Sequence, residues 1–167
     1  MHEMTESNLK AAFAGESQAH MKYKAFAEQA QQEGLPEVAR LFRAISFAEQ
    51  VHALNHLKQL QGIGSTAKNL GAAIDGESYE NTEMYPSFSA VAKEQGEKGA
   101  MLSIHYALEA EKIHEKMYGD AKELVQAGQD RPAAPVYICP VCGFTVIGDP
   151  PEKCPVSQTP KEKFVKF

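Results

Sequence analysis

Two short segments of this 167-residue chain each carry a glutamate followed three residues later by a histidine: Glu49 with His52, and Glu111 with His114. On an α-helix, side chains at positions i and i+3 leave the same face about one turn apart. A carboxylate and an imidazole placed in this way can bind one metal ion together. Two such helices, combined with single glutamates from two further helices, are typical of four-helix bundles that hold a pair of metal ions. The sequence therefore predicts a two-metal carboxylate site.

Three further glutamates, Glu16, Glu80 and Glu83, lie at or beside helix positions that we expect to be buried. An ionised carboxylate without a partner costs on the order of several kcal/mol to bury, while a whole domain is stable by only about 5–15 kcal/mol. The neighbouring buried positions offer no cation to compensate this charge, so metal ions must do so. Glutamate oxygens with histidine nitrogens favour iron or manganese and also accept zinc. We expect two iron ions.

The three cysteines, Cys139, Cys142 and Cys154, form a second candidate metal site. Cys139 and Cys142 belong to a Cys-x-x-Cys knuckle of the kind that binds metals. A second knuckle, beginning at Cys154, would place its thiolate at position 157, where the chain has Ser157. We therefore expect one iron or zinc ion on three cysteines. Its fourth ligand is left open between the Ser157 oxygen, water and an empty position.

Helices must position the bundle ligands, and a duplicated helical hairpin would supply them. The segment Gly15-Glu16-Ser17 recurs as Gly76-Glu77-Ser78, and Glu16 precedes Glu49 by 33 residues while Glu80 precedes Glu111 by 31. A third helix carries Glu80 and Glu83, and we expect a kink at Pro86 because proline lacks a backbone donor. The apolar periodicity predicts the other helices over about 9–32, 36–60 and 97–127, with a crossover connection over 61–78.

Composition excludes several kinds of partner. The net charge of −5 gives no reason to expect nucleic acid or an anionic membrane as a partner. No apolar segment approaches the roughly 20 residues that span a bilayer, and the first residues lack the features of a secretory signal. An odd number of clustered cysteines favours a metal site in a reducing compartment over disulfides. We therefore expect a cytoplasmic protein.

The chain resembles the rubrerythrin family over nearly all of its length. The resemblance rests on Ala14-Gly15-Glu16-Ser17-Gln18-Ala19, on both Glu-x-x-His segments, on Tyr79-Glu80-Asn81-Thr82-Glu83-Met84-Tyr85-Pro86 and on the cysteine knuckle. It implies an all-α, ferritin-like four-helix bundle over residues 1–130 and a linker over 131–135. Residues 136–167 would form a small rubredoxin-like domain of short β-strands.

The resemblance also implies a role for each ligand. Glu49 and Glu111 would bridge the two irons, and Glu16 would be a terminal ligand of one of them. Glu80 and His114 would bind the other iron. Glu83 would share an iron with His52 and exchange with it as the redox state changes.

The implied activity is reduction of hydrogen peroxide to water, with two ferrous ions supplying the electrons. The rubredoxin-like iron would relay electrons from a reductase or rubredoxin, and the small domain would approach the di-iron site of a partner in a homodimer. Whether helices are exchanged between subunits is left open. Two alternatives remain: a ferroxidase that sequesters iron, and a zinc-filled structural protein. Glu83 and the cysteine domain favour the peroxidase.

Overall fold

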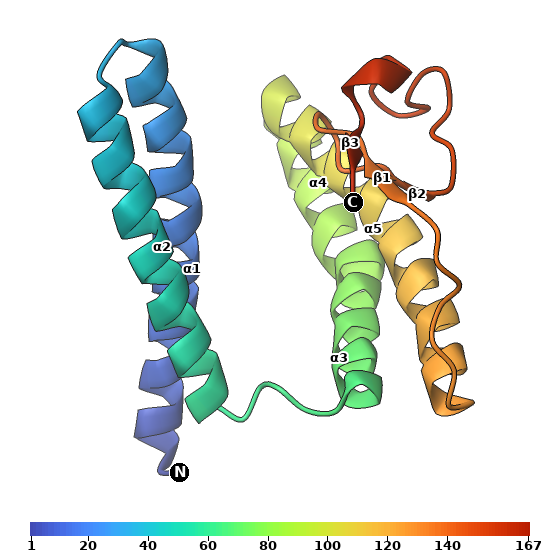
Figure 1. Cartoon of the computed structure of the whole chain (residues 1–167), viewed down its shortest axis with the longest axis horizontal. Coiled ribbons are helices and arrows are strands. Elements are labelled where there is room, and N and C mark those ends of the chain that lie inside the picture. The colour runs from blue at the N-terminus through green and yellow to red at the C-terminus, as the bar shows by residue number, and fades with distance from the viewer. The chain divides into compact units, whose positions relative to one another are not determined.

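A computed structural model describes all 167 residues. The chain is mostly helical and ends in a small antiparallel sheet, which confirms the expected fold class (Figure 1). None of its helices combines the length and the apolar character needed to cross a membrane. The helices are α1 (Glu3–Gln32), α2 (Pro36–Gln59), α3 (Thr66–Tyr79), the π-helix η1 (Glu80–Met84), α4 (Tyr85–Glu94), α5 (Lys98–Gln126) and the 3₁₀-helix η2 (Lys161–Lys163). The strands are β1 (Val136–Ile138), β2 (Thr145–Ile147) and β3 (Val165–Lys166).

The chain forms two compact units, residues 1–64 and 65–167, and each is described by itself. The first is a hairpin of α1 and α2. Gly34, at φ +77°, ends α1, and Pro36 occupies the first turn of α2. The buried residues of the hairpin are small, which lets the two helices approach closely: Ala27, Ala30, Ala39, Ser46 and Ala53.

A polar contact fixes the hairpin near its middle. The Ser46 hydroxyl donates to the His20 carbonyl oxygen over 2.9 Å, and His20 Nδ1 lies 2.8 Å from the Ser46 carbonyl oxygen. His20 therefore joins α1 to α2.

The second unit differs from the sequence-based expectation in where its first helix begins. Residues 61–78 were expected to be a connection, but α3 already begins at Thr66. Ser65 caps it, since its hydroxyl oxygen accepts from the Lys68 backbone amide over 3.4 Å. Gly71 faces α5 closely, because a Cβ there would lie 3.2 Å from Lys122 Nζ. The small residues that suggested a loop instead allow two helices to pack.

Proline at position 86 disturbs the helix, as expected, but it does not break it. The segment immediately before it, η1, is a π-helix in which the Tyr85 amide donates to the Glu80 carbonyl oxygen, five residues back. Pro86 then lies in the first turn of α4. A π turn holds an extra residue and rotates the side chains around it relative to a regular α-helix. This rotation bears directly on which glutamates share a face.

The small sheet at the C-terminal end has strand order β2-β1-β3, with all pairs antiparallel. It supports a core of three buried cysteines and Phe164. The knuckle at Gly143 lies against α5 within the same unit: a Cβ added there would lie 3.4 Å from Ala110 Cβ. The small domain thus contacts α5 of its own chain.

We predict that Ser46→Ala lowers the stability of the metal-free protein by about 0.5–1.5 kcal/mol, because it removes the hydrogen bond from the Ser46 hydroxyl to the His20 carbonyl oxygen that joins α1 to α2. Urea denaturation followed by circular dichroism measures this loss. Ser17→Ala is the matched control, since Ser17 only donates to the Phe13 carbonyl oxygen one turn earlier in its own helix. Equal losses in both variants would contradict the proposed link between helices.

Candidate metal centre

The hairpin of the first unit brings three of the predicted ligands together. Glu16 lies on α1, and Glu49 and His52 lie one turn apart on α2, with their ligand atoms within 4.8 Å of one another. His52 Nδ1 is 2.9 Å from Glu49 Oε2 and 3.9 Å from Glu16 Oε1. The Glu49 side chain is 17% exposed and that of His52 is 54% exposed. We call these residues the hairpin group.

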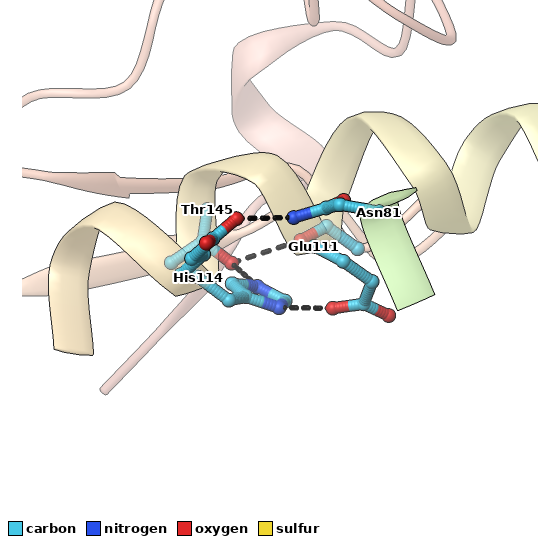
Figure 2. Close-up of polar contacts among 6 residues, drawn as sticks. Asn81, Glu111, His114 and Thr145 are labelled. Carbon is cyan, nitrogen blue, oxygen red and sulfur yellow. Dashed lines mark hydrogen bonds and ion pairs between the residues drawn. The ribbon is translucent and has the colours of Figure 1, made fainter. Parts of the chain in front are cut away.

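The second unit forms a corresponding group from Glu77, Glu111 and His114, also within 4.8 Å. His114 Nδ1 lies 2.6 Å from Glu111 Oε2, again one turn apart on a single helix, α5 (Figure 2). We call these three residues the α5 group. Glu111 and His114 were predicted from their spacing. The sequence did not predict Glu77 as a ligand, although the repeated Gly-Glu-Ser segment makes Glu77 the counterpart of Glu16 in sequence.

Glu77 is the residue that most needs a cation. Its Oε2 atom is buried and has no hydrogen-bond partner. Burial, and then the hydrogen bond and negative charge of Glu111, raise the pKa of Glu77 to about 8. A carboxylate in this position keeps its proton at neutral pH unless a positive charge compensates it. The unpaired Glu77 oxygen, together with Glu111 and His114, therefore fits a divalent metal ion.

The two other glutamates predicted on this helix differ in environment. Burial, and then the charge of Glu111, raise the pKa of Glu80, while His114 lowers it, so Glu80 faces the α5 group. Glu83 is exposed and belongs to no group of potential ligands. Both residues lie in the π-helix, where a spacing of three no longer keeps two side chains on one face. The assignment of Glu83 as a ligand stays a prediction.

Thr145 of the small sheet fixes the orientation of His114. The Thr145 hydroxyl donates to the Gly143 carbonyl oxygen over 2.8 Å, so its oxygen is left to accept from His114 Nε2–H, also over 2.8 Å. Figure 2 shows Thr145 and Glu111 on either side of the imidazole ring. Because the proton is held on Nε2, Nδ1 is the nitrogen available to a metal.

The cysteine cluster has the composition that the sequence predicts. Cys139, Cys142 and Cys154 are buried, carry free thiols and lie within 4.8 Å of one another. Burial opposes ionisation of Cys139, but hydrogen bonds from the Ser157 and Thr159 hydroxyls and from backbone amides outweigh it and lower its pKa to about 6. Burial raises the pKa of Cys142 to about 11. These thiols suit a borderline or soft metal ion.

We predict that metal loading of the α5 group releases a proton from Glu77. Below pH 8 the metal-free carboxyl is protonated, and the metal binds the ionised form. The apparent affinity therefore rises with pH up to about 8 and levels off above it. Anaerobic titration with Fe²⁺ in weak buffer at pH 7 measures the release, which should fall by about one proton in Glu77→Gln. The control is Glu83→Gln, which should release as many protons as the native chain. Native-like proton release in Glu77→Gln would contradict the assignment of Glu77 as a ligand.

A second prediction concerns Thr145, which is only 6% exposed. Thr145→Val keeps the shape of the side chain but removes the acceptor for His114 Nε2–H, so the affinity of the α5 group for Fe²⁺ should fall about 10–100-fold. Thr145→Ser retains the hydroxyl and should bind nearly as the native chain does. Competition with a ferrous chelator under anaerobic conditions measures both. Equal affinity in the valine and serine variants would mean that Thr145 does not orient the ligand.

Comparison with known proteins agrees with this arrangement. The Rubrerythrin family matches residues 7–122, and the family described as Rubrerythrin, rubredoxin-like domain matches residues 137–165. Rubrerythrin-2 of Clostridium acetobutylicum is 42% identical, over 98% of this chain and 97% of that protein. Nigerythrin of Nitratidesulfovibrio vulgaris is 35% identical, over 98% of this chain and 86% of that protein.

Solved structures give the same relationship. Nigerythrin in its fully reduced, all-ferrous state has a TM-score of 0.59 and 34% identity to this chain, covering 98% of this chain and 86% of its own. The mixed-valence state of nigerythrin has a TM-score of 0.58. In sequence, in fold and in its two kinds of potential metal ligands, this chain belongs to the rubrerythrin family.

Proposed function

We propose that this chain reduces hydrogen peroxide to water at the di-iron site of its family, with ligands drawn from the hairpin group and from the α5 group. Membership of the rubrerythrin family makes the chain an oxidoreductase that acts on peroxide, with a di-iron site and a rubredoxin-like iron–cysteine site. The observation that carries the proposal is the duplication of one donor set. Each unit presents two glutamates and one histidine within 4.8 Å.

The proposed ligands follow from these two groups. Glu49 and Glu111 occupy equivalent places in them and are the proposed bridging carboxylates, with Glu80 added because it faces the α5 group. Glu83 is retained as the sequence-based alternative to Glu77. The full proposed set is Glu16, Glu49, His52, Glu77, Glu80, Glu111 and His114.

Exposed apolar side chains occur on helices of both units. Large side chains of α2, such as Leu41 at 58% and Phe47 at 65%, are exposed on the first unit. On α4 of the second unit, Phe88 is 52% exposed and Val91 is 55% exposed. In ferritin-like bundles, apolar helix faces of this kind are buried against other helices. We propose bundle, linker and small-domain boundaries of 1–130, 131–135 and 136–167.

Two ferrous ions, when bound, would supply the two electrons that the reduction of peroxide requires. The chain's own residues hold them and control protons nearby. The carboxylates offset the metal charge, and Thr145 holds the proton of His114 on Nε2. Burial, and then the charges of Glu80, Glu111 and Glu77, raise the pKa of Tyr85, so its phenol keeps its proton at neutral pH and can donate a hydrogen bond beside these carboxylates.

The partners are hydrogen peroxide and an electron donor of the rubredoxin type. We further propose a homodimer, as the family resemblance implies, and a cytoplasmic location. The free thiols of the cysteine cluster support that location, because they are maintained in a reducing compartment.

Steady-state kinetics test the proposed reaction. The iron-loaded chain, supplied with a reductase and its reductant, should consume many equivalents of peroxide per chain without gaining iron. Accumulation of many irons per chain, with dioxygen consumed and peroxide untouched, would instead support iron sequestration. A protein that binds only zinc and stays inactive after iron reconstitution would contradict both.

Two variants on one helix test the ligand assignment. Glu77→Gln should lower kcat/KM for peroxide by about a hundredfold or more, because it removes a carboxylate that we assign to the metal. Glu83→Gln should change it by less than about threefold, because Glu83 is exposed. Iron content is measured in both preparations. The reverse ranking would restore Glu83 as the ligand and remove Glu77.

A further inference from the structure

The second cysteine knuckle repeats the backbone of the first, with serine in place of its final cysteine. In the first, the Gly143 amide donates to the Cys139 carbonyl oxygen over 3.0 Å, and the Cys139 amide donates to the Phe144 carbonyl oxygen over 2.9 Å. In the second, the Gln158 amide donates to the Cys154 carbonyl oxygen and the Cys154 amide to the Thr159 carbonyl oxygen, over 2.9 and 2.8 Å. Ser157 therefore occupies the place that Cys142 has in the first knuckle.

The backbone at position 158 keeps the left-handed conformation of the first knuckle, although the residue there is not glycine. Gly143 adopts φ +77°, and its counterpart Gln158 adopts φ +60°, a region that non-glycine residues seldom enter. The Gln158 side chain donates to the Cys154 carbonyl oxygen over 3.3 Å, which helps to hold the turn. The knuckle is thus preserved although both of its distinguishing residues, a cysteine and a glycine, are absent.

The side-chain atoms are spaced like the ligands of one tetrahedral metal ion. Cys142 Sγ lies 3.5 Å from Cys154 Sγ, and Ser157 Oγ lies 3.2 Å from Cys139 Sγ. Ligand atoms about 2.3 Å (sulfur) and 2.1 Å (oxygen) from a tetrahedral ion are about 3.6–3.8 Å apart, so each pair would open by a few tenths of an ångström when a metal binds. No carboxylate or histidine joins the three cysteines. Ser157 is therefore the side chain placed to complete the set.

Thr159 gives the serine hydroxyl a partner. Its Oγ1 lies 2.7 Å from Ser157 Oγ, and the residue is only 6% exposed. Hydrogen bonds from both hydroxyls reach Cys139. A ligand oxygen oriented by a buried neighbouring hydroxyl is held more firmly than an exposed serine would be.

We propose that the cysteine site of this chain binds a divalent ion, Fe²⁺ or Zn²⁺, through three thiolates and the Ser157 oxygen, with Thr159 as the positioning residue for that oxygen. A hydroxyl oxygen is a harder and weaker ligand than a thiolate. The site should therefore release its metal more readily than a four-cysteine site does. This inference rests on metal occupancy of the cysteine cluster and not on the peroxide chemistry of the bundle.

Cobalt(II) is the probe that tests the ligand set in the full-length chain. Only thiolate ligands give intense sulfur-to-cobalt charge-transfer bands, so cobalt bound by the carboxylate groups does not contribute to them. The native chain should show the charge-transfer intensity of three thiolates, and Ser157→Cys should gain the intensity of a fourth. Failure to gain it would mean that position 157 does not face the metal, and would overturn the proposal.

Affinity measurements separate ligation from folding. Ser157→Ala should bind cobalt at least about tenfold more weakly, and Thr159→Val about tenfold more weakly than the matched Thr159→Ser, which keeps the hydroxyl. Native-like affinity and spectra in Ser157→Ala, or equal affinity in the two Thr159 variants, would overturn the respective assignment. Peroxidase activity plays no part in these readouts, so failure of the proposed function would be recognised separately.

Discussion

Negative charge gathered between helices is the constraint on which this protein depends. In the α5 group, two carboxylates lie close enough for one to raise the pKa of the other, and one buried oxygen has no hydrogen-bond donor. Protonation relieves this in the metal-free chain, and a divalent ion relieves it while adding two positive charges. The same donor set, two glutamates and one histidine, recurs in the hairpin group.

The small domain contributes to this centre as well as carrying its own metal site. The Thr145 hydroxyl oxygen accepts a hydrogen bond from His114 Nε2–H across the contact between β2 and α5. The same hydroxyl donates to the carbonyl oxygen of the knuckle residue Gly143. The knuckle that carries Cys142 is therefore joined to a proposed iron ligand by two hydrogen bonds.

Departure from the four-cysteine pattern changes the chemistry of that second site without changing its backbone. The hydrogen bonds of the knuckle are retained around Ser157 and Gln158. Backbone shape and ligand identity are thus separable here: the turn positions whichever side chain stands at 157, and that side chain decides the charge and hardness of the site. The buried Thr159 hydroxyl suits an oxygen ligand, because it can share a hydrogen bond with it.

The sequence by itself determined the fold class and the helices with strong signals. It also indicates six of the seven ligands that we propose, because Glu-x-x-His spacing and helical periodicity act locally. Glu77 and the early start of α3 required the tertiary structure. In the sequence Gly71 suggests a loop, but in the structure it lies in a helix that packs against α5. The π-helix changes which glutamates share a face. Helical periodicity assumes a regular α-helix, and only the packed chain reveals where that regularity is lost. The contact of Thr145 with His114 likewise joins residues far apart in sequence, which no spacing rule relates.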